Sequence, residues 1–373
     1  MNGKDLRGIS VVSFPISKAF SVPISNLLNI LSATSETYAI IGTQDQIHFQ
    51  KLDHLAHIYV LPYQSDSSMI RQMVVKYGIL QLRTCFKLFS LRKDSQGVIF
   101  FMEFPPLLAM VVAKMFHHKV YWLLPSKILL LSNGIVSKLT AILSRICCNL
   151  CNGIILYSSS FISHWNLEKY DHNILIAHEH FLDFDMFTVT TPLPDRPPLI
   201  GYIGRLSEEK GVQHFAQALP AIFSDRQDLC AFIAGDGPLK DSIVVSLQEG
   251  IAANVDLLGW ISHDDLPRYL NQLRLLVLPS YTEGLPNIML EAMACGTPVL
   301  ATPVGAIPDI IIDSKTGFIM EDNSPDCIAE NVVRALNSPD LEQIAENGRR
   351  FVEANFTFEK VVENWEGVLQ GFR

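Results

Sequence analysis

The chain has 373 residues, of which 49% are hydrophobic and 18% are charged, and its formal net charge is −9 at pH 7. This composition excludes a disordered protein, and the length predicts about two domains, each large enough for its own core. An acidic chain that does not interleave aromatic with basic residues also gives no reason to expect a nucleic-acid partner. The opening residues MNGKDLRGIS lack the apolar stretch of a signal peptide, and no apolar run is long enough to span a membrane. We therefore expect a cytoplasmic globular protein.

The first half of the chain alternates short apolar runs with helical patterns. Ile24, Leu28 and Leu31, for example, have the spacing of a helix face. This alternation predicts a doubly wound parallel sheet. The runs that we interpret as buried strands are Ile9–Phe14, Tyr38–Gly42, His57–Leu61, Val98–Met102, Lys119–Leu124 and Gly153–Tyr157.

Charge is distributed unevenly between the two halves. Residues 1–185 carry a net charge of +4, and the remainder carries −13. Within the basic half, the segment Lys127–Leu150 places Lys127, Lys138 and Arg145 among leucines and isoleucines. Such a segment could lie on an anionic membrane surface at the cytoplasmic face. The alternative is a core helix with basic residues at its wet edge.

The seven cysteines are odd in number and show no spacing typical of a disulfide framework. Cys148 and Cys151 make a CxxC pair, but they lie in an amphipathic helical pattern rather than after a strand and a turn. We expect buried thiols in a reducing compartment rather than a redox or metal site.

The sequence His178-Glu179-His180, followed by Asp183 and Asp185, resembles the spacing of metal ligands. Alternate residues of a strand point the same way, and the two carboxylates follow within reach. We nevertheless expect no metal. A contact of His178 with the acceptor or donor, or a plain surface segment, remain the two open interpretations.

The stretch Thr191–Pro198 is rich in proline and predicts a stiff linker between two domains. The predicted domains are residues 1–190 and 199–355, and the terminal residues 356–373 are expected to return to the first domain. Beyond the linker, apolar runs again alternate with helical patterns, which predicts a second parallel sheet. The runs are Leu199–Ile203, Leu229–Ala234, Val255–Leu258, Leu273–Leu278 and Pro298–Ala301.

A glycine turn with two cations follows the first of these runs. Arg205 and Lys210 can both reach an anion above the turn, and a guanidinium with an ammonium suits a diphosphate. The alternative is a solvated helix start, in which these cations pair with Glu208 and Glu209.

A second loop carries two glutamates separated by seven residues, Glu283 and Glu291. The first follows an apolar strand, and the second lies about one turn into a helix. Gly284 allows a ligand to approach the backbone, and Pro286 suits the first turn of a helix. The amides of Leu285, Asn287 and Ile288 would then form an anion site, while each carboxylate can accept two hydrogen bonds from a sugar diol.

The ordered set of these motifs resembles the retaining glycosyltransferases of the GT-B fold, glycosyltransferase family 4. The resemblance is dense over residues 198–370 and holds only in outline over residues 1–190. It implies two doubly wound Rossmann-like domains facing across a cleft. The motifs that carry the resemblance are Gly204-Arg205, Lys210-Gly211, Ala234–Pro238, Gly259–Ile261, Glu283–Asn287 and Glu291–Pro298.

The resemblance implies a nucleotide diphosphate sugar as donor, and a glycan, a lipid-linked molecule or a small molecule as acceptor. No cofactor or metal is expected, because Arg205, Lys210 and the loop amides would stabilise the leaving phosphate. Glu283 would orient the donor sugar and Glu291 would hold the ribose. The predicted donor contacts are Gly204, Arg205, Lys210, Gly235, Trp260, Ile261, Glu283, Gly284, Leu285, Pro286, Asn287 and Glu291. For Trp260, core packing is the alternative.

The first half departs from the family pattern in two places. The loop after the first strand has no Gly-Gly turn, and Lys18 is a candidate acceptor contact there. The fifth strand ends at Leu124-Pro125-Ser126 without the histidine that many family members have. Glu103 is the remaining candidate for a catalytic base and acceptor contact. An inactive nucleotide-sugar-binding scaffold, or a phosphorylase or epimerase on a similar fold, are the alternative functions.

Overall fold

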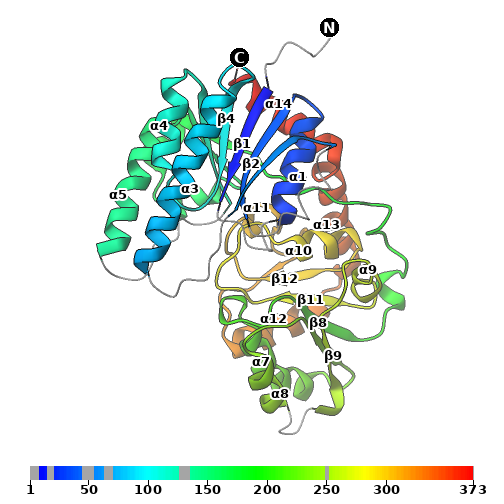
Figure 1. Ribbon diagram of the computed structural model, residues 1–373. Coiled ribbons are helices and arrows are strands. Elements are labelled where there is room, and N and C mark those ends of the chain that lie inside the picture. Colours follow the sequence, from blue (N-terminus) through cyan, green and yellow to red (C-terminus); the bar gives the residue numbers. More distant parts are fainter. Residues whose placement is uncertain are drawn as a thin grey trace. The chain divides into compact units, whose positions relative to one another are not determined.

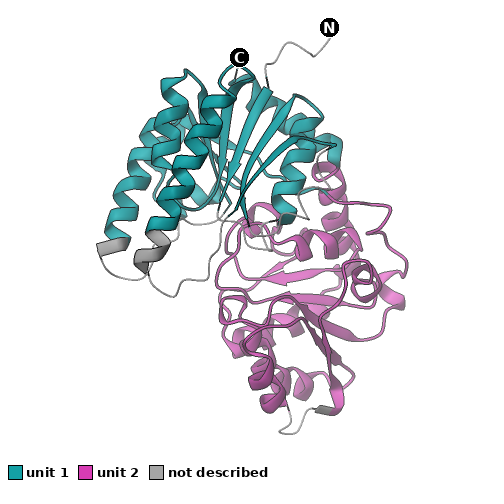
Figure 2. Ribbon diagram, viewed as in Figure 1, with its two compact units in different colours: residues 1–181, 358–373 teal, residues 182–357 magenta. Residues whose placement is uncertain are grey.

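The computed structural model describes residues 8–14, 21–43, 54–62, 70–125, 135–247 and 252–372. The chain divides into two compact units, which are coloured separately in Figure 2. Unit 1 contains residues 1–181 and 358–373, and unit 2 contains residues 182–357.

Unit 1 is built on a seven-stranded parallel sheet in the order β3-β2-β1-β4-β5-β6-β7. The six strands predicted from apolar runs are present, with ends that differ by at most three residues. The sequence did not predict β7, because three residues are too few to show a pattern. The strands are β1 (Gly8–Ser13), β2 (Thr37–Thr43), β3 (His57–Pro62), β4 (Ser95–Phe101), β5 (Lys119–Leu124), β6 (Gly153–Leu156) and β7 (Ile174–Ile176).

Helices cover this sheet, and α3, α4 and α5 stand side by side in Figure 1. The terminal helix α14 belongs to unit 1, where it packs against α1 and its Trp365 Nε1 donates to the His178 carbonyl at 2.8 Å. None of the described helices is both long and apolar enough to cross a membrane. The helices are α1 (Ser21–Ser32), α3 (Ile70–Ser90), α4 (Leu107–Met115), α5 (Ile135–Leu150), α6 (Ser160–His164), the 3₁₀ helix η2 (Glu168–Asn173) and α14 (Phe358–Gln370).

Unit 2 has a six-stranded parallel sheet in the order β10-β9-β8-β11-β12-β13. Its strands are β8 (Leu199–Ile203), β9 (Cys230–Ala234), β10 (Val255–Gly259), β11 (Leu275–Leu278), β12 (Val299–Ala301) and β13 (Phe318–Ile319). Its helices are η3 (Leu193–Asp195), η4 (Glu208–Lys210), α7 (Val212–Asp225), α8 (Lys240–Leu247), η5 (Ala252–Asn254), α9 (Leu266–Leu270), α10 (Asn287–Ala294), α11 (Ile307–Ile310), α12 (Pro325–Leu336) and α13 (Leu341–Asn355).

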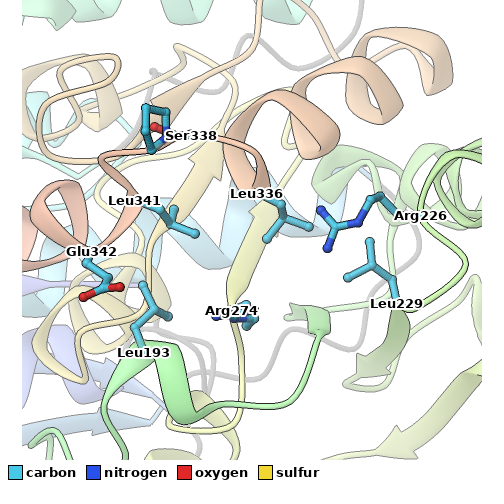
Figure 3. A pocket seen from close by; sticks show the side chains of 9 residues that line it. Leu193, Arg226, Leu229, Arg274, Leu336, Ser338, Leu341 and Glu342 are labelled. Carbon is cyan, nitrogen blue, oxygen red and sulfur yellow. The ribbon is translucent and has the colours of Figure 1, made fainter.

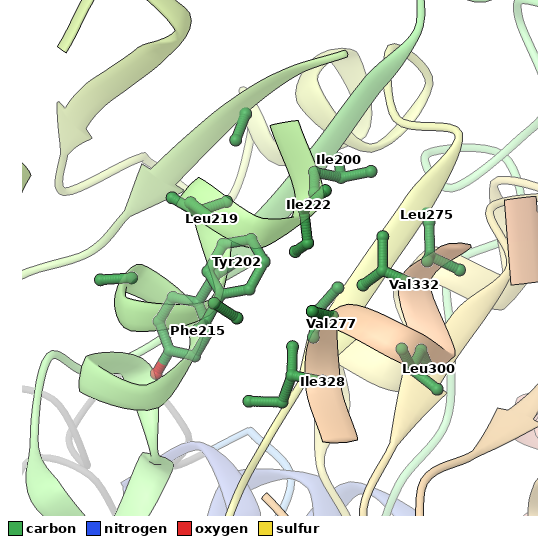
Figure 4. Packing of buried hydrophobic residues seen from close by; sticks show 14 of the residues in the cluster. Ile200, Tyr202, Phe215, Leu219, Ile222, Leu275, Val277, Leu300, Ile328 and Val332 are labelled. Carbon is green, nitrogen blue, oxygen red and sulfur yellow. The ribbon is translucent and has the colours of Figure 1, made fainter. Parts of the chain in front are cut away.

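The core of unit 2 lies between this sheet and the helices α7 and α12 (Figure 4). Val277 on β11 is fully buried, and Ile222 and Ile328 reach the same cluster from the two helices. Apolar residues at helical spacing on α7 and α12 therefore meet the apolar face of the strands. This packing fixes β8 and β11. The turn of Arg205 and Lys210 follows β8, and the loop of Glu283 follows β11.

The proline-rich stretch Thr191–Pro198 is not a free linker, because it belongs to unit 2. Arg196 is buried there and donates to the carbonyls of Leu273 at 2.9 Å and Cys295 at 2.7 Å, and to Thr297 Oγ1 at 2.7 Å. The division between the units falls after residue 181, about ten residues before the predicted linker. Proline content indicates a stiff backbone, but it does not distinguish a linker from a segment anchored by a buried arginine.

The CxxC cysteines are buried free thiols, as predicted. Cys148 lies on α5, and Cys151 follows the end of that helix. Burial raises the pKa of Cys148 to about 12 and the pKa of Cys151 to about 11. Neither sulfur therefore has the thiolate character that metal binding or redox chemistry requires.

Candidate functional site

The two charged motifs follow adjacent strands of unit 2. The turn of Arg205 and Lys210 follows β8, and the loop of Glu283 follows β11. These strands pair in parallel, with Leu275 opposite Ile200, so their carboxyl ends lie at the same edge of the sheet. The order of the strands across the sheet changes direction at this point. From β8 the chain continues to β9 and β10 on one side, whereas β11 and the strands after it lie on the other side of β8. Ligands of open α/β sheets bind at such a reversal.

An ion pair joins the two loops at this edge. Lys210 Nζ lies 2.7 Å from Glu283 Oε1 and 2.8 Å from Oε2, and Ser280 Oγ donates to Oε1 at 2.7 Å. The Glu283 side chain is 8% exposed and that of Lys210 is 30% exposed. The alternative pairing of Lys210 with the neighbouring glutamates of its own turn is therefore wrong. The carboxylate is held by two donors, while the Lys210 side chain remains partly exposed.

Arg205 is held less tightly than Lys210. Its Nη1 lies 3.9 Å from Glu209 Oε1, and the two side chains are 68% and 46% exposed. Glu209 is also bound by Ser207 Oγ at 2.6 Å, and this hydrogen bond lowers the pKa of Glu209. A long, exposed ion pair contributes little to stability. The guanidinium therefore retains donors for an anion above the turn.

Two glycines allow the loops to approach each other. Gly211 has φ +66°, and a Cβ there would lie 1.9 Å from the Pro279 carbonyl oxygen. Gly235 has φ +136°, and a Cβ there would lie 1.8 Å from the Gly204 carbonyl oxygen. Gly235 was predicted as a donor contact, and the structure gives it a packing reason as well. A side chain at Gly211 would push the Lys210 turn away from the loop after β11, and one at Gly235 would push the loop after β9 away from the Arg205 turn.

Helix α10 begins at Asn287, directly after the Glu283 loop. Pro286 precedes the helix as its N-cap, with φ −74° and ψ 117°, rather than occupying the first turn as predicted. The prediction is wrong by one residue because proline suits both an extended N-cap and a first helical position. Leu285 and Pro286 are buried, whereas Asn287 is exposed. The first amides of a helix have no acceptor within it, so they can bind an anion.

Glu291 lies in the second turn of α10 and is 7% exposed. Its Oε1 lies 3.2 Å from His263 Nε2, and this hydrogen bond raises the pKa of His263. The His263 ring also packs edge-on against Phe187, with centroids 5.3 Å apart. The sequence did not predict His263, although it comes two residues after Ile261 in the loop that follows β10.

We expect the pKa of His263 to lie above 6.5 and to return toward that value in a Glu291→Gln variant. The reason is that a carboxylate favours the protonated imidazole, whereas an amide does not. The pH titration of the ring signals by NMR measures this directly, with the other histidines as internal references. An unchanged His263 titration in the variant would contradict the contact between the two side chains.

Trp260 and Ile261 follow β10 at the same edge of the sheet. The Trp260 side chain is 74% exposed, so the core-packing alternative is wrong. An exposed indole beside polar loops can stack on a ligand ring. Ile261 is half-buried.

A cavity of about 160 Å³ lies elsewhere in unit 2 (Figure 3). Its lining residues Leu229 and Arg274 directly precede β9 and β11, so the cavity lies at the amino ends of the strands. None of the charged motif residues lines it. This cavity is therefore separate from the candidate site.

Comparisons with known proteins show which sequences and folds this chain resembles. Residues 185–351 match the family model of the glycosyl transferases group 1. The chain is 32% identical over 162 residues to an uncharacterized glycosyltransferase of Methanocaldococcus jannaschii, covering 43% of this chain and 44% of that protein. It is 28% identical over 202 residues to the alpha-D-kanosaminyltransferase of Streptomyces kanamyceticus, covering 52% of each.

The chain spans about half the length of these curated relatives. Its fold resembles that of Anabaena HepE, whose crystal structure contains UDP, with a TM-score of 0.76 and 14% identity over 98% of this chain and 100% of that one. Two α/β units with parallel sheets and this likeness confirm the GT-B fold that the motifs predicted.

The predicted residues of the first half belong to unit 1, outside the residues that match this family model. Lys18 lies outside the described residues. Glu103 follows β4 and His178 follows β7, and both are half-buried. Burial lowers the pKa of His178 to about 4, so its imidazole is neutral at neutral pH.

The side chains with metal-like spacing are not gathered into one cluster. Within the described ranges, no group of three or more His, Cys, Asp or Glu side chains has the geometry to hold a metal ion. Asp183 Oδ1 instead accepts the amides of Asp185 at 3.0 Å and Met186 at 3.1 Å. This carboxylate closes a local turn, as aspartate often does.

A buried acid in unit 1 was missed by the sequence analysis. Glu179 is 1% exposed, and Tyr157 Oη donates to its Oε1 at 2.5 Å. Burial raises the pKa of Glu179 to about 8, so the group is largely protonated at neutral pH. Tyr157 and Glu179 follow β6 and β7, so the pair lies at the carboxyl edge of the first sheet.

Proposed function

We propose that the protein transfers a sugar from a nucleotide diphosphate sugar to an acceptor hydroxyl group, with retention of the anomeric configuration and without a metal. One observation carries the proposal. Lys210 and Glu283 are in contact at the carboxyl ends of two adjacent strands, directly before the start of α10. The contact places a cation, a carboxylate and helix amides within one small region. These are the groups that a sugar joined to a diphosphate requires.

Cleavage of the anomeric C–O bond creates negative charge on the departing phosphate. Arg205, Lys210 and the first amides of α10 would stabilise that charge. Such preorganised donors usually contribute the largest part of catalysis. The cationic groups also take the place of a metal ion, which is the basis of the metal-independent proposal.

The two glutamates are assigned to the two ends of the donor. Glu283, fixed by Lys210 and Ser280, would bind the sugar hydroxyls and favour positive charge at the anomeric carbon. Glu291, at the side of α10, would accept hydrogen bonds from the ribose diol. The exposed Trp260 and the backbone at Ile261, which follow β10 at the same edge of the sheet, would contact the base.

The acceptor is assigned to unit 1, as a glycan, a lipid-linked molecule or a small molecule. Glu103 is the proposed base and acceptor contact, because it follows β4 at the carboxyl edge of the first sheet. His178 and Lys18 are the other proposed acceptor contacts. In a retaining transfer the leaving phosphate can itself take the proton of the acceptor hydroxyl, so the missing histidine after the fifth strand does not prevent activity.

A thermal-shift screen against UDP-, GDP- and ADP-sugars tests donor binding, because a ligand that binds the folded state raises the melting temperature. The anomeric configuration of the product, measured by NMR with and without EDTA, tests retention and metal independence. We expect one nucleotide series to stabilise the protein and an α-linked donor to give an α-linked product in EDTA. No stabilisation by any nucleotide would contradict the proposal.

Arg205→Ala should lower kcat/KM on the order of 100-fold, equivalent to about 3 kcal/mol of transition-state stabilisation. The expected loss arises because the guanidinium would meet the charge that develops on the phosphate. Arg350→Ala is the matched control, since the Arg350 side chain on α13 is equally exposed and pairs with Glu346. Equal kcat/KM values for the two variants would contradict the role of Arg205.

A binding protein without turnover is the second candidate function. The first half lacks the Gly-Gly turn and the histidine of the family pattern, and these departures favour it. Calorimetry with the stabilising nucleotide sugar, combined with an assay for donor hydrolysis, separates the two candidates. Binding with neither hydrolysis nor transfer would favour the scaffold.

A further inference from the structure

The outer face of helices α3, α4 and α5 is unusually apolar. The three helices lie side by side on unit 1 (Figure 1), and contacts join α3 to α4 and α4 to α5. Eleven large apolar side chains on this face are between 38% and 77% exposed. They are Val75, Ile79, Leu82, Phe86 and Phe89 on α3, Leu108, Val111 and Met115 on α4, and Leu139, Ile142 and Ile146 on α5. We call this set the outer face.

On each helix the exposed apolar residues recur at intervals of three and four, so they form a stripe along one side. Phe86 is 77% exposed and Met115 is 70% exposed. Three adjacent stripes make a broad patch rather than scattered single residues. Monomeric soluble proteins rarely expose a contiguous apolar patch above roughly 300–600 Å², and larger patches mark interaction sites.

Helix α5 exposes large apolar side chains that packing against its own sheet does not account for. Its buried side carries Thr140 and Ser144 together with Cys147 and Cys148, and Ser144 Oγ donates to the Thr140 carbonyl at 2.8 Å. Its exposed side carries Leu139 and Ile142, each 54% exposed. Large apolar side chains thus lie on the exposed side of α5, where a helix that serves only its own core would carry polar residues. Lys127, in the segment for which a membrane surface was considered, lies outside the described residues.

The charged side chains of the three helices that carry the outer face are all basic. The sequences of α3, α4 and α5 contain no aspartate or glutamate. Arg83 on α3 is exposed, as are Lys138 and Arg145 on α5. On α3, Lys87 Nζ lies over the Tyr59 ring, 3.1 Å from its centroid. Long basic side chains can cover apolar surface with their stems while their charged ends reach a polar layer.

We propose that the outer face binds the surface of a lipid bilayer that carries anionic headgroups. Apolar stripes flanked by lysine and arginine, with no carboxylate among them, are typical of a surface that enters the headgroup region. A partner helix would fill one groove between two stripes. The outer face is instead three helices wide, which suits the flat surface of a bilayer better than a single helix.

Flotation of the full chain with vesicles tests the proposal independently of activity. The vesicles are phosphatidylcholine alone, or phosphatidylcholine mixed with phosphatidylglycerol. We expect binding to the anionic vesicles at low salt and weaker binding to the neutral ones. High salt should weaken binding to the anionic vesicles, because it screens the attraction between exposed charges.

Two sets of variants locate the contact. The first variant combines three charge reversals, Arg83→Glu, Lys138→Glu and Arg145→Glu. It should lower the vesicle partition coefficient at least about tenfold, since each basic residue near an anionic surface contributes to binding. Its matched control reverses three exposed cations of unit 2, Lys240, Arg268 and Lys315. The control should bind nearly as well as the parent chain.

The apolar variant is Leu82→Ser, Phe86→Ser, Ile142→Ser, with Val245→Ser on α8 as its control, because Val245 is 62% exposed in unit 2. We expect the triple variant to lose vesicle binding and the control to keep it. Melting temperatures close to that of the parent would show that each variant folds. No binding to anionic vesicles, or equal binding by the variants and their controls, would overturn the proposal. Sedimentation velocity that shows self-association through these residues, without vesicle binding, would also overturn it.

Discussion

Glu283→Gln should leave the binding of the nucleotide sugar within several-fold of the parent protein and remove most turnover, on the order of 100-fold in kcat. The amide keeps the size of the side chain and an oxygen that can accept from Ser280, which donates to Glu283 at 2.7 Å. It loses the negative charge that favours positive charge at the anomeric carbon. Calorimetry and steady-state kinetics with the same donor separate the two effects.

Glu330→Gln is the matched control for this substitution, because Glu330 is an exposed glutamate on α12 in the same unit. It should retain both binding and turnover. If Glu283→Gln kept the turnover of this control, the catalytic role of Glu283 would be wrong. If Glu283→Gln lost donor binding as well, the carboxylate would act mainly in holding the substrate.

Glu179→Gln should change how the stability of unit 1 depends on pH. The pKa of Glu179 is raised to about 8 by burial, whereas an unfolded glutamate has its ordinary value of about 4.5. Between these values the unfolded chain releases a proton that the folded chain retains. The free energy of unfolding therefore falls as pH rises through this window, by on the order of 5 kcal/mol in total.

The glutamine variant removes this titration and keeps an oxygen for the Tyr157 hydroxyl, which donates to Glu179 at 2.5 Å. Denaturant unfolding at several pH values between 5 and 8 should show the variant gaining stability relative to the parent as pH rises. Glu168→Gln, at an exposed glutamate of η2, should show no such trend. A difference between Glu179→Gln and parent that stays constant with pH would contradict the buried, protonated carboxyl group.

The sequence predicted the parts of the fold that depend on local patterns. Apolar runs located strands such as β5 and β8 to the residue, because a buried parallel strand is a continuous apolar segment. Glycine and charge patterns located the loops of Lys210 and Glu283. The contact between these side chains, which are 73 residues apart, follows only once their strands are known to be neighbours.

Other features depend on tertiary packing that no local pattern encodes. The anchoring of Arg196 against β11 and α10 assigns the proline-rich stretch to unit 2. Glu179 becomes a buried acid only because β6 and β7 place it beside Tyr157. The exposure of Trp260, for which core packing was the alternative, likewise depends on how the loop after β10 leaves the sheet.

A crystal structure of the chain with a nucleoside diphosphate tests the proposed donor site most directly. We expect the diphosphate between the turn of Arg205 and Lys210 and the start of α10, with the ribose hydroxyls on Glu291. A diphosphate bound away from both loops, or a ribose turned away from Glu291, would contradict the assignment of this edge of the sheet as the donor site.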